Sequence, residues 1–273
     1  MKDIAVIYHK NCPDGFAGAW AAWRKFKDSA EYIPIQHYDP IPAGLKGKIV
    51  YFIDIVYPLE VFKIITSTNT VIAIDHHKTA KETVKLASEY VFDQEHSGAV
   101  LAWHYFHATK KLPEFLKYIE IRDLWKFRSQ KEREIAAAME FIAYDFEALN
   151  KAARLFETAS GRKDYQKRGS VALKYKELIV ADVLNDIQKI MFHGLKTGVI
   201  NSPVFKSEIG NRISLLGYDM AIIWHKVNDS FFVSLRSGPL VDVSTIAKKY
   251  GGGGHPQASG FVLKGEQTLP WEK

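Results

Sequence analysis

The chain has 273 residues, of which 47% are hydrophobic and 25% charged, so it has the balance of a globular protein with room for one large domain or two ordinary ones. The formal net charge is +6: residues 151–273 carry 18 Lys and Arg against 11 Asp and Glu, whereas residues 1–150 carry 19 against 20. The single cysteine, Cys12, excludes an intramolecular disulfide framework. No apolar run is long enough to cross a bilayer, and the N-terminus is typical of a strand rather than a signal peptide. We therefore expect a cytoplasmic protein without a membrane partner.

Strand and helix patterns alternate over the first 106 residues. Helix 15–26 places Phe16, Ala19, Trp20 and Trp23 on one face, and Ser97 is a suitable N-cap for helix 98–106. We predict strands at 4–8, 32–35, 49–53 and 71–74, and helices at 15–26, 58–65 and 98–106. This alternation predicts an α/β domain whose parallel sheet is covered on both faces.

Helical patterns dominate from about residue 132 to residue 192. Val180, Val183, Leu184, Ile187 and Met191 form an apolar stripe at helical spacing, and Gly194 reads as a helix end. Beyond it we predict strands at 198–201, 220–224, 231–235 and 261–263, and a helix at 243–250. We therefore expect three parts: an α/β domain over 1–130, a helical linker over 131–192, and a smaller α/β domain over 193–273.

Acids and histidines follow the predicted strands of the first domain. They are His9 and Asp14, then Asp54, then Asp75, His76 and His77, with Asp123 at a predicted helix end. Each has an ordinary explanation alone, as a loop hydrogen bond or a helix cap. Together, at one edge of a parallel sheet, they favour a divalent cation, and the mixture of carboxylate and imidazole suits manganese, magnesium or iron better than structural zinc. Paired divalent ions commonly serve the hydrolysis of phosphate esters by activating a water.

A second signal lies near the C-terminus. Arg236 ends a predicted strand, and four glycines at 251–254 precede His255. Backbone N–H groups of glycines can approach an anion closely, and arginine can bind a phosphate with two parallel hydrogen bonds. A flexible loop explains the glycines alone equally well, but the combination favours a phosphate-binding segment.

These motifs resemble the DHH phosphoesterase family. Asp75-His76-His77 after an apolar strand is similar to the family signature, and Asp54 and Asp123 fall where its second and fourth motifs are expected. The segment 251–261, with Arg236-Ser237 before it, resembles the DHH-associated C-terminal domain. Members of the family include nano-RNases, single-strand exonucleases, cyclic-dinucleotide phosphodiesterases, and polyphosphate and pyrophosphate hydrolases.

The resemblance implies a catalytic, metal-binding domain with a parallel sheet over 1–130, a helical linker over 131–192 and a smaller α/β domain over 193–273 that binds substrate. The active site would lie in the cleft between the domains. It implies two manganese ions, with magnesium or another divalent ion as alternatives. Asp54 would bridge the ions, Asp14, His76 and Asp123 would complete one site, and His9 would serve the other. His77 would touch the scissile phosphate or protonate the leaving oxygen, and Asp75 would orient a histidine. A list of substrate-binding residues follows by the same resemblance: Arg236, Ser237, Gly252, Gly253, Gly254 and His255.

The first motif departs from the family pattern. Cys12 stands where the family usually has an acid, within His9-Lys10-Asn11-Cys12-Pro13-Asp14. A thiolate prefers softer ions than manganese, so Cys12 is either a metal ligand that alters metal preference or a small residue packed beside the loop.

We predict a metal-dependent hydrolase of phosphodiester or phosphomonoester bonds in short oligonucleotides or nucleotides, and leave open whether it forms a homodimer. The alternatives are a polyphosphate or pyrophosphate hydrolase and a non-catalytic nucleotide-binding module. A nucleotide enzyme would need base stacking, for which Tyr218, Trp224 and Phe231 are candidates, although core packing explains each of them.

Overall fold

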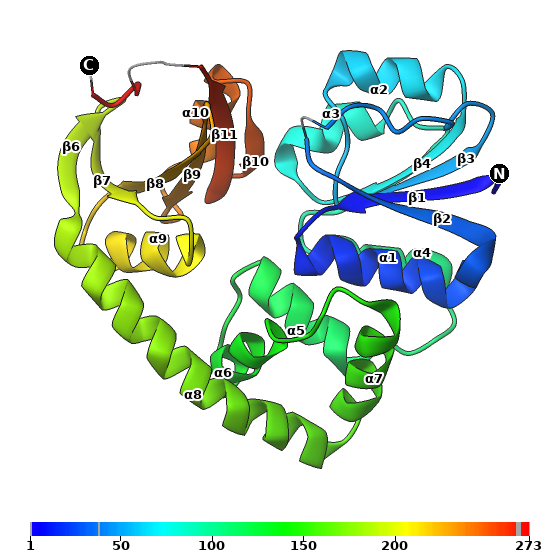
Figure 1. The fold of residues 1–273 in the computed structure, drawn as a ribbon, viewed down its shortest axis with the longest axis horizontal. Helices are drawn as coiled ribbons and strands as arrows, with labels where there is room; N and C mark the ends of the chain where they lie inside the picture. The colour runs from blue at the N-terminus through cyan, green and yellow to red at the C-terminus, as the bar shows by residue number, and fades with distance from the viewer. Residues whose placement is uncertain (1, 38, 266–268, 273) are drawn as a thin grey trace. The chain divides into compact units, whose positions relative to one another are not determined.

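The chain forms two compact units, Met1–Leu173 and Lys174–Lys273, in a computed structural model that describes residues 2–37, 39–265 and 269–272 (Figure 1). Both units combine a β-sheet with helices, as the α/β fold class predicts. No helix of these described residues combines the length and apolar character that a membrane span needs. The predicted division into a catalytic domain, a linker and a substrate-binding domain concerns roles and stays a prediction.

Unit 1 is built on a sheet of five parallel strands in the order β2-β1-β3-β4-β5. The strands are β1 (Ile4–His9), β2 (Ala30–Ile35), β3 (Ile49–Ile53), β4 (Thr70–Asp75) and β5 (Glu89–Phe92). Four of them were predicted from buried apolar runs, and β5, which is only half-buried, was not. Pro34 lies in the edge strand β2, where a missing N–H donor is tolerated.

Helices cover both faces of this sheet. In β1, Ala5 and Ile7 join the apolar cluster that contains α2 and α3, whereas Val6 and Tyr8 join the cluster that contains α1 and α4. The helices of unit 1 are α1 (Pro13–Phe26), α2 (Leu59–Thr66), α3 (Lys81–Val84), α4 (Gly98–Phe106), α5 (Glu114–Asp123), α6 (Gln130–Met139) and α7 (Phe146–Phe156), and the division between the units falls within α8 (Ala159–Val183). Helices α5 to α7 extend the α1 side of the core.

Unit 2 has a six-stranded sheet in the order β10-β11-β9-β8-β7-β6, in which only the β7–β8 pair is parallel. Ile209 and Ile213 of α9 pack on one face with Ala221 and Ile223, and α10 packs on the other with a second apolar cluster. The elements of unit 2 are β6 (Gln188–Phe192), β7 (Leu195–Asn201), α9 (Lys206–Leu215), β8 (Met220–Val227), β9 (Ser230–Ser237), α10 (Val243–Lys249), β10 (Gly253–His255) and β11 (Ala258–Lys264).

The predicted helical stretch ends earlier than its apolar stripe suggests. Helix α8 ends at Val183, and residues 188–192 form strand β6 rather than helix. His193 and Gly194 have positive φ values of 53° and 75° and form the two-residue turn of a β6–β7 hairpin. Gly194 is therefore a hairpin residue and not a helix end, because the ladder with β7 outweighs the helical spacing of the stripe.

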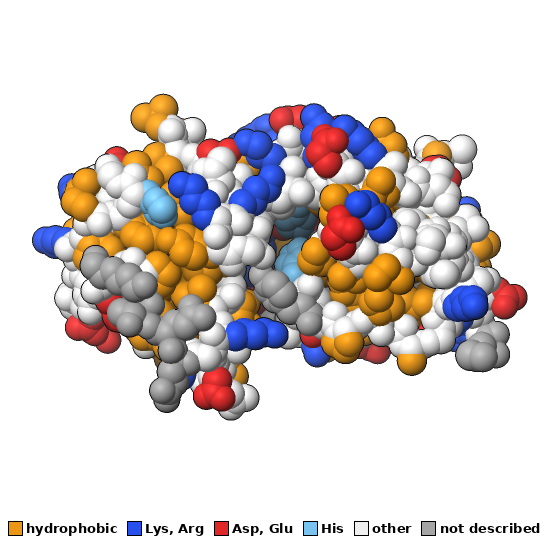
Figure 2. All heavy atoms as spheres, turned by 90° about the horizontal axis from the view of Figure 1, so that it is seen from above, with side chains coloured by type: hydrophobic (Ala, Val, Ile, Leu, Met, Phe, Trp, Pro, Cys, Tyr) orange, Lys and Arg blue, Asp and Glu red, His pale blue; other side chains and the backbone are white. Residues whose placement is uncertain are grey.

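Charged side chains are mixed on the surface. On the face drawn in Figure 2, Lys and Arg side chains lie among acidic and apolar ones. The net charge by itself therefore does not locate a binding site.

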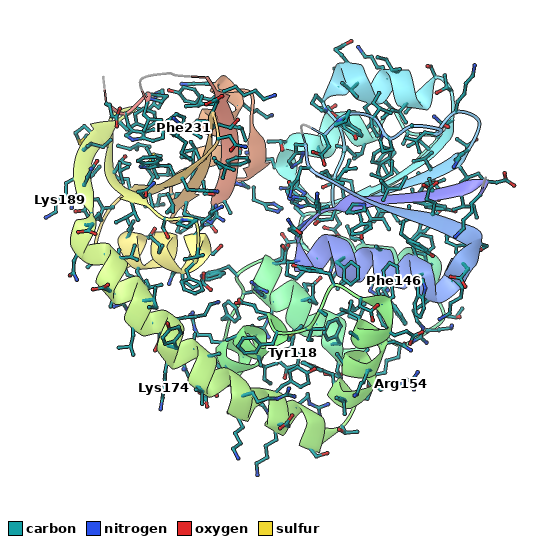
Figure 3. All side chains as sticks on the ribbon, viewed as in Figure 1. Tyr118, Phe146, Arg154, Lys174, Lys189 and Phe231 are labelled. Carbon is teal, nitrogen blue, oxygen red and sulfur yellow. The ribbon has the colours of Figure 1, made fainter. Side chains whose placement is uncertain are left out.

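Aromatic contacts tie the later helices of unit 1 to its first helix. Phe146 of α7, labelled in Figure 3, stacks on Phe16 of α1 with ring centroids 5.0 Å apart. Trp23 of α1 stacks on the same ring at 5.4 Å. The start of α1, which carries Asp14, is thereby fixed against the helical layer.

Candidate functional site

The strand order of unit 1 places the predicted metal ligands at a single edge of the sheet. From β1 the chain moves outward to β2 and then returns to form β3 on the other side of β1, so the order reverses between β1 and β3. Ligands of open parallel sheets bind at the carboxyl ends of the strands beside such a reversal. His9 ends β1, Asp54 follows β3, and Asp75 ends β4 before His76 and His77.

Two helices bring further carboxylates to this edge. Asp14 lies in the first turn of α1, and its Oδ1 accepts a hydrogen bond of 3.1 Å from the backbone N–H of Ala99, at the start of α4. Asp123 is the last residue of α5. Asp14 is almost fully buried, and Asp123 has a side-chain exposure of 23%.

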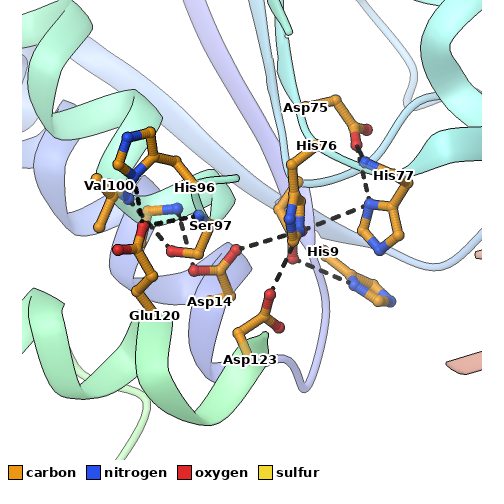
Figure 4. A network of polar contacts seen from close by, with 12 residues as sticks. His9, Asp14, Asp75, His76, His77, His96, Ser97, Val100, Glu120 and Asp123 are labelled. Carbon is orange, nitrogen blue, oxygen red and sulfur yellow. Dashed lines mark hydrogen bonds and ion pairs between the residues drawn. The ribbon is translucent and has the colours of Figure 1, made fainter. Parts of the chain in front are cut away.

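His76 lies at the centre of the first ligand group (Figure 4). Its Nε2 is 3.1 Å from Asp54 Oδ1, 3.5 Å from Asp123 Oδ2 and 3.7 Å from Asp14 Oδ2. Asp14, His76 and Asp123 each offer a donor atom within 4.8 Å of the others. Adjacent ligands of an octahedral ion with bonds of about 2.1 Å lie about 3 Å apart, so only small movements would gather these atoms around one ion.

His9, Cys12 and Asp54 form the second group, with donor atoms within 4.8 Å of one another. His9 Nδ1 lies 3.4 Å from Asp54 Oδ2, whereas Asp54 Oδ1 faces His76 of the first group. The Asp54 carboxylate thus has one oxygen toward each group, which is the arrangement of a bridging ligand.

Asp54 reaches this position through an unusual backbone conformation. Its φ is 62°, in the left-handed region that aspartate tolerates better than most other residues. Such conformations persist only where the surrounding structure holds them, and they concentrate at functional sites.

The buried charges of the site shift one another's pKa values. Burial raises the pKa of Asp14 well above its usual range, and Asp123 and Asp54 raise it further. The pKa of Asp123 is also raised, by burial and by Asp54. Burial favours neutral forms of Asp54 and His76 too, but their mutual contact and the neighbouring charges prevail, so the pKa of Asp54 lies well below its usual range and that of His76 is raised to about 10. Without a cation, the carboxylate cluster therefore compensates its charge by retaining protons.

The donor atoms present fit divalent cations. Oδ2 of Asp14, Asp54 and Asp123 is buried in each case and accepts no hydrogen bond from the part of the chain that the structure describes. Buried carboxylate oxygens without donors are costly unless a cation compensates them. The set of carboxylates and imidazoles suits manganese or a similar ion. Burial and the three carboxylates raise the pKa of the Cys12 thiol, so this side chain would need a cation to become a thiolate ligand.

Asp75 and His77 form a separate pair beside the clusters. Asp75 Oδ1 lies 2.9 Å from His77 Nδ1 and accepts a hydrogen bond of 2.7 Å from the His77 backbone N–H. Burial lowers the pKa of His77, but Asp75 outweighs it and the net pKa is raised. Asp75 thus fixes the orientation of the His77 ring.

Three residues that shape the site were not predicted. Glu120 Oε2 accepts a 3.0 Å hydrogen bond from the backbone N–H of Ser97 and lies 3.0 Å from His96 Nδ1, which holds α5 against the start of α4 (Figure 4). His37, beyond the carboxyl end of β2, has its ring 5.5 Å from that of His9, and its position after a strand was a usable signal. A Cβ at Gly98 would lie 2.8 Å from Asp54 Cβ and 2.9 Å from Asp14 Oδ2, so any larger residue would displace these carboxylates.

The predicted substrate-binding residues lie in unit 2. Arg236 donates to the backbone oxygen of Leu235 at 2.9 Å and to Ser207 Oγ at 3.2 Å, and Ser237 Oγ donates to the oxygen of Val241. Gly253, Gly254 and His255 pair with β11, and a Cβ at Gly252 would lie 2.0 Å from the backbone oxygen of Gly260. The glycines thus permit a close backbone approach within the sheet, and their contact with phosphate stays a prediction.

Comparison with known proteins finds a domain family, sequence relatives and solved structures of similar fold. The DHHA1 domain family matches residues 203–270. Uncharacterized protein R106 of Acanthamoeba polyphaga mimivirus is 33% identical over 98% of this chain and 69% of its own. Oligoribonuclease NrnB of Bacillus subtilis is 26% identical over 71% of this chain and 53% of its own, so the match spans about half of that protein. The crystal structure of RecJ from Thermus thermophilus in complex with Mn²⁺ has the same fold, with a TM-score of 0.52 and 17% identity over 96% of this chain and 49% of that one.

Proposed function

The chain belongs to the DHH phosphoesterase family, and on this premise we propose that it is a metal-dependent hydrolase of phosphodiester or phosphomonoester bonds in short oligonucleotides or nucleotides. The observation that carries the proposal is the position of Asp54, whose two oxygens face two separate groups of metal ligands. The relative NrnB is an oligoribonuclease, which supports an oligonucleotide as the substrate.

We assign the ligands to two divalent ions. Asp54 would bridge them, Asp14, His76 and Asp123 would complete one site, and His9 would serve the other together with Cys12. Divalent ions there would supply positive charge for the phosphoryl oxygens and lower the pKa of a water. Manganese suits the mixture of imidazole and carboxylate better than magnesium, which prefers oxygen ligands.

His77 is the residue to which we assign proton transfer. The contact between Asp75 and Nδ1 fixes the ring, and the net rise in pKa keeps the imidazole protonated nearer to neutral pH. Nε2 would then hold the proton that the leaving oxygen receives. Asp75 acts on this step by positioning the ring.

A substrate panel tests the proposal. The chain is first freed of metal by chelation and then assayed with manganese or magnesium on a dinucleotide, a nucleoside bisphosphate, pyrophosphate and tripolyphosphate. We expect hydrolysis of the dinucleotide or bisphosphate only with added metal, faster with manganese. Asp54→Asn should abolish it, whereas Asp28→Asn, an equal change at an exposed residue remote from the site, should not.

Two results would contradict the proposal. Full activity after exhaustive chelation would exclude a role for divalent ions. Hydrolysis of tripolyphosphate or pyrophosphate alone would exclude the nucleotide substrate while leaving the metal centre in place.

A further inference from the structure

One face of the unit 2 sheet carries cationic and aromatic side chains together. Alternate residues of a strand lie on one face, so Phe232, Ser234 and Arg236 of β9 form a row of side chains on the same face. The register with β8 pairs Phe232 with His225 and Arg236 with Ala221. Because α9 packs on Ala221, this is the α9 face of the sheet.

An aromatic pair lies at one end of this row. The rings of His225 and Phe232 are stacked, with centroids 5.3 Å apart and an interplanar angle of 22°. Phe232 is 39% exposed, although β9 is an inner strand between β8 and β11. Its exposure therefore does not result from a position at the sheet edge.

The aromatic residues that the sequence suggested for stacking are placed differently. Trp224 and Phe231 pack with each other in the cluster on the α10 face, where Figure 3 labels Phe231. Tyr218 is buried in the cluster beneath α9. Core packing therefore accounts for these three, and Phe232 is the ring that offers an accessible face.

Two cations lie toward the other end of the row. Burial lowers the pKa of Arg236 to about 10, and burial together with Arg236 lowers the pKa of Lys206. Lys206 is the first residue of α9 and precedes Ser207, whose Oγ accepts a hydrogen bond of 3.2 Å from Arg236, so the Lys206 backbone lies beside Arg236. Among the residues described, neither Lys206 nor Arg236 forms an ion pair with a carboxylate. Against the effect of burial, Glu208 raises the pKa of Arg236 but is paired with Lys176 at 2.8 Å, so an anion would complement the two cations.

We propose that Phe232 and His225 form a stacking platform for a nucleobase of the substrate, and that Lys206 joins Arg236 in binding the phosphate next to that base. The inference rests on the proposed function and assigns the base-bearing part of the substrate to unit 2. Phe232 and Arg236 are four positions apart in β9, or about 13 Å of strand, so a ligand that contacts both side chains must be longer than a single phosphate. Bases stack on aromatic rings and phosphates bind to cations, whereas a polyphosphate chain has nothing to stack.

The test uses the full chain with manganese and two ligands: a dinucleotide and the same dinucleotide with abasic sugars. Phe232→Ala and Phe232→Leu should weaken binding and raise KM for the normal dinucleotide by about five- to hundredfold, with little change for the abasic one. Phe232→Tyr, which keeps the ring, should restore binding. Lys206→Ala should weaken both ligands alike, because it removes a phosphate contact.

Met191→Ala is the matched control, since Met191 is 67% exposed and lies in β6, separated from β9 by two strands. It should leave both ligands unaffected, and thermal melting of each variant checks folding. Two results would overturn the platform. In one, Phe232→Ala weakens binding of the normal and the abasic dinucleotide equally. In the other, Phe232→Leu binds the normal dinucleotide as tightly as Phe232→Tyr does. Binding is measured independently of hydrolysis. A chain that binds dinucleotide through Phe232 but cleaves neither the dinucleotide nor a nucleoside bisphosphate would refute the proposed function and leave the platform standing.

Discussion

Replacement of Gly98 by alanine would test the geometry of the proposed metal centre without removing any candidate ligand. The added Cβ would lie 2.8 Å from Asp54 Cβ and 2.9 Å from Asp14 Oδ2. Ordinary van der Waals contact begins at 3.4 Å, so Asp54 Cβ alone would have to move by 0.6 Å (3.4 − 2.8). Helix α4 begins at Gly98 with no positive φ, so its backbone accepts alanine without strain of its own.

The displacement should appear in metal affinity more than in stability. Changes next to metal ligands commonly cost about 10- to 100-fold in affinity or activity, or roughly 1.4–2.7 kcal/mol. One added methyl in a packed site costs about 1–3 kcal/mol of stability, offset by about 0.5–1 kcal/mol from the better helix propensity of alanine. We therefore expect Gly98→Ala to bind manganese about 10- to 100-fold more weakly, with a modest loss of Tm.

Gly198→Ala supplies the matched control. Gly198 is buried in β7 of unit 2, and its added Cβ would lie 2.7 Å and 2.8 Å from the side chains of Ile187 and Ile213. It introduces similar crowding with no metal ligand nearby. Manganese titration by calorimetry and thermal melting on both variants separate the effects. Manganese affinity of Gly98→Ala within twofold of wild type, or equal losses in the two variants, would refute the reasoning.

Three further predictions concern the ligands themselves. Asp54→Ala should abolish turnover with the fold intact and cost more than His9→Ala, because only Asp54 faces both groups; wild-type rates in the Asp54 variant would contradict this. Cys12→Asp should shift metal preference toward harder ions without destroying activity, and an unchanged preference and rate would make Cys12 a packing residue. Manganese binding should release protons and tighten as the pH rises from about 6 to about 9, because burial raises the pKa of Asp14 and that of His76, despite burial, is raised to about 10. Calorimetry in two buffers measures the released protons. Binding without proton release would contradict the prediction. The raised pKa of His76 also predicts that the metal-free fold loses stability as the pH rises from 6.5 to about 10, so manganese should raise Tm most at the upper end.

The sheet of unit 1 and the gathering of acids and histidines at its edge were predictable because both depend on local patterns. Buried strands read as apolar runs, and the residues after Ile53 and Ile74 are acids and histidines. Parallel strands bring their carboxyl ends to one edge wherever they stand in the sheet, so the gathering of Asp54 and His76 did not require the strand order. The reversal between β1 and β3, which places His9 beside Asp54, is a tertiary property.

Other elements were not predictable from local pattern. Residues 188–192 continue the helical spacing of α8 and nevertheless form β6, because pairing with β7 decides the outcome. Helix α9 was not predicted, since Ile209 and Ile213 are its only fully buried apolar side chains and too few to establish a period. Its start at Phe205, whose φ is 52°, also lacks the usual capping residue.

The position of Asp123 shows why the site cannot be read from motifs alone. This residue ends α5, and α5 is held to the start of α4 by Glu120, three residues earlier, through the backbone of Ser97. The same start of α4 is held by Asp14 through Ala99. The positions of Asp14 and Asp123 therefore both depend on the N-terminus of α4. The first N–H groups of a helix have no partner within the helix, so they favour carboxylates nearby. Contacts between residues 14 and 99, and between 97 and 120, join segments that are distant in sequence, so the chemistry of the site was visible in the sequence whereas its geometry depends on the packing of α1, α4 and α5.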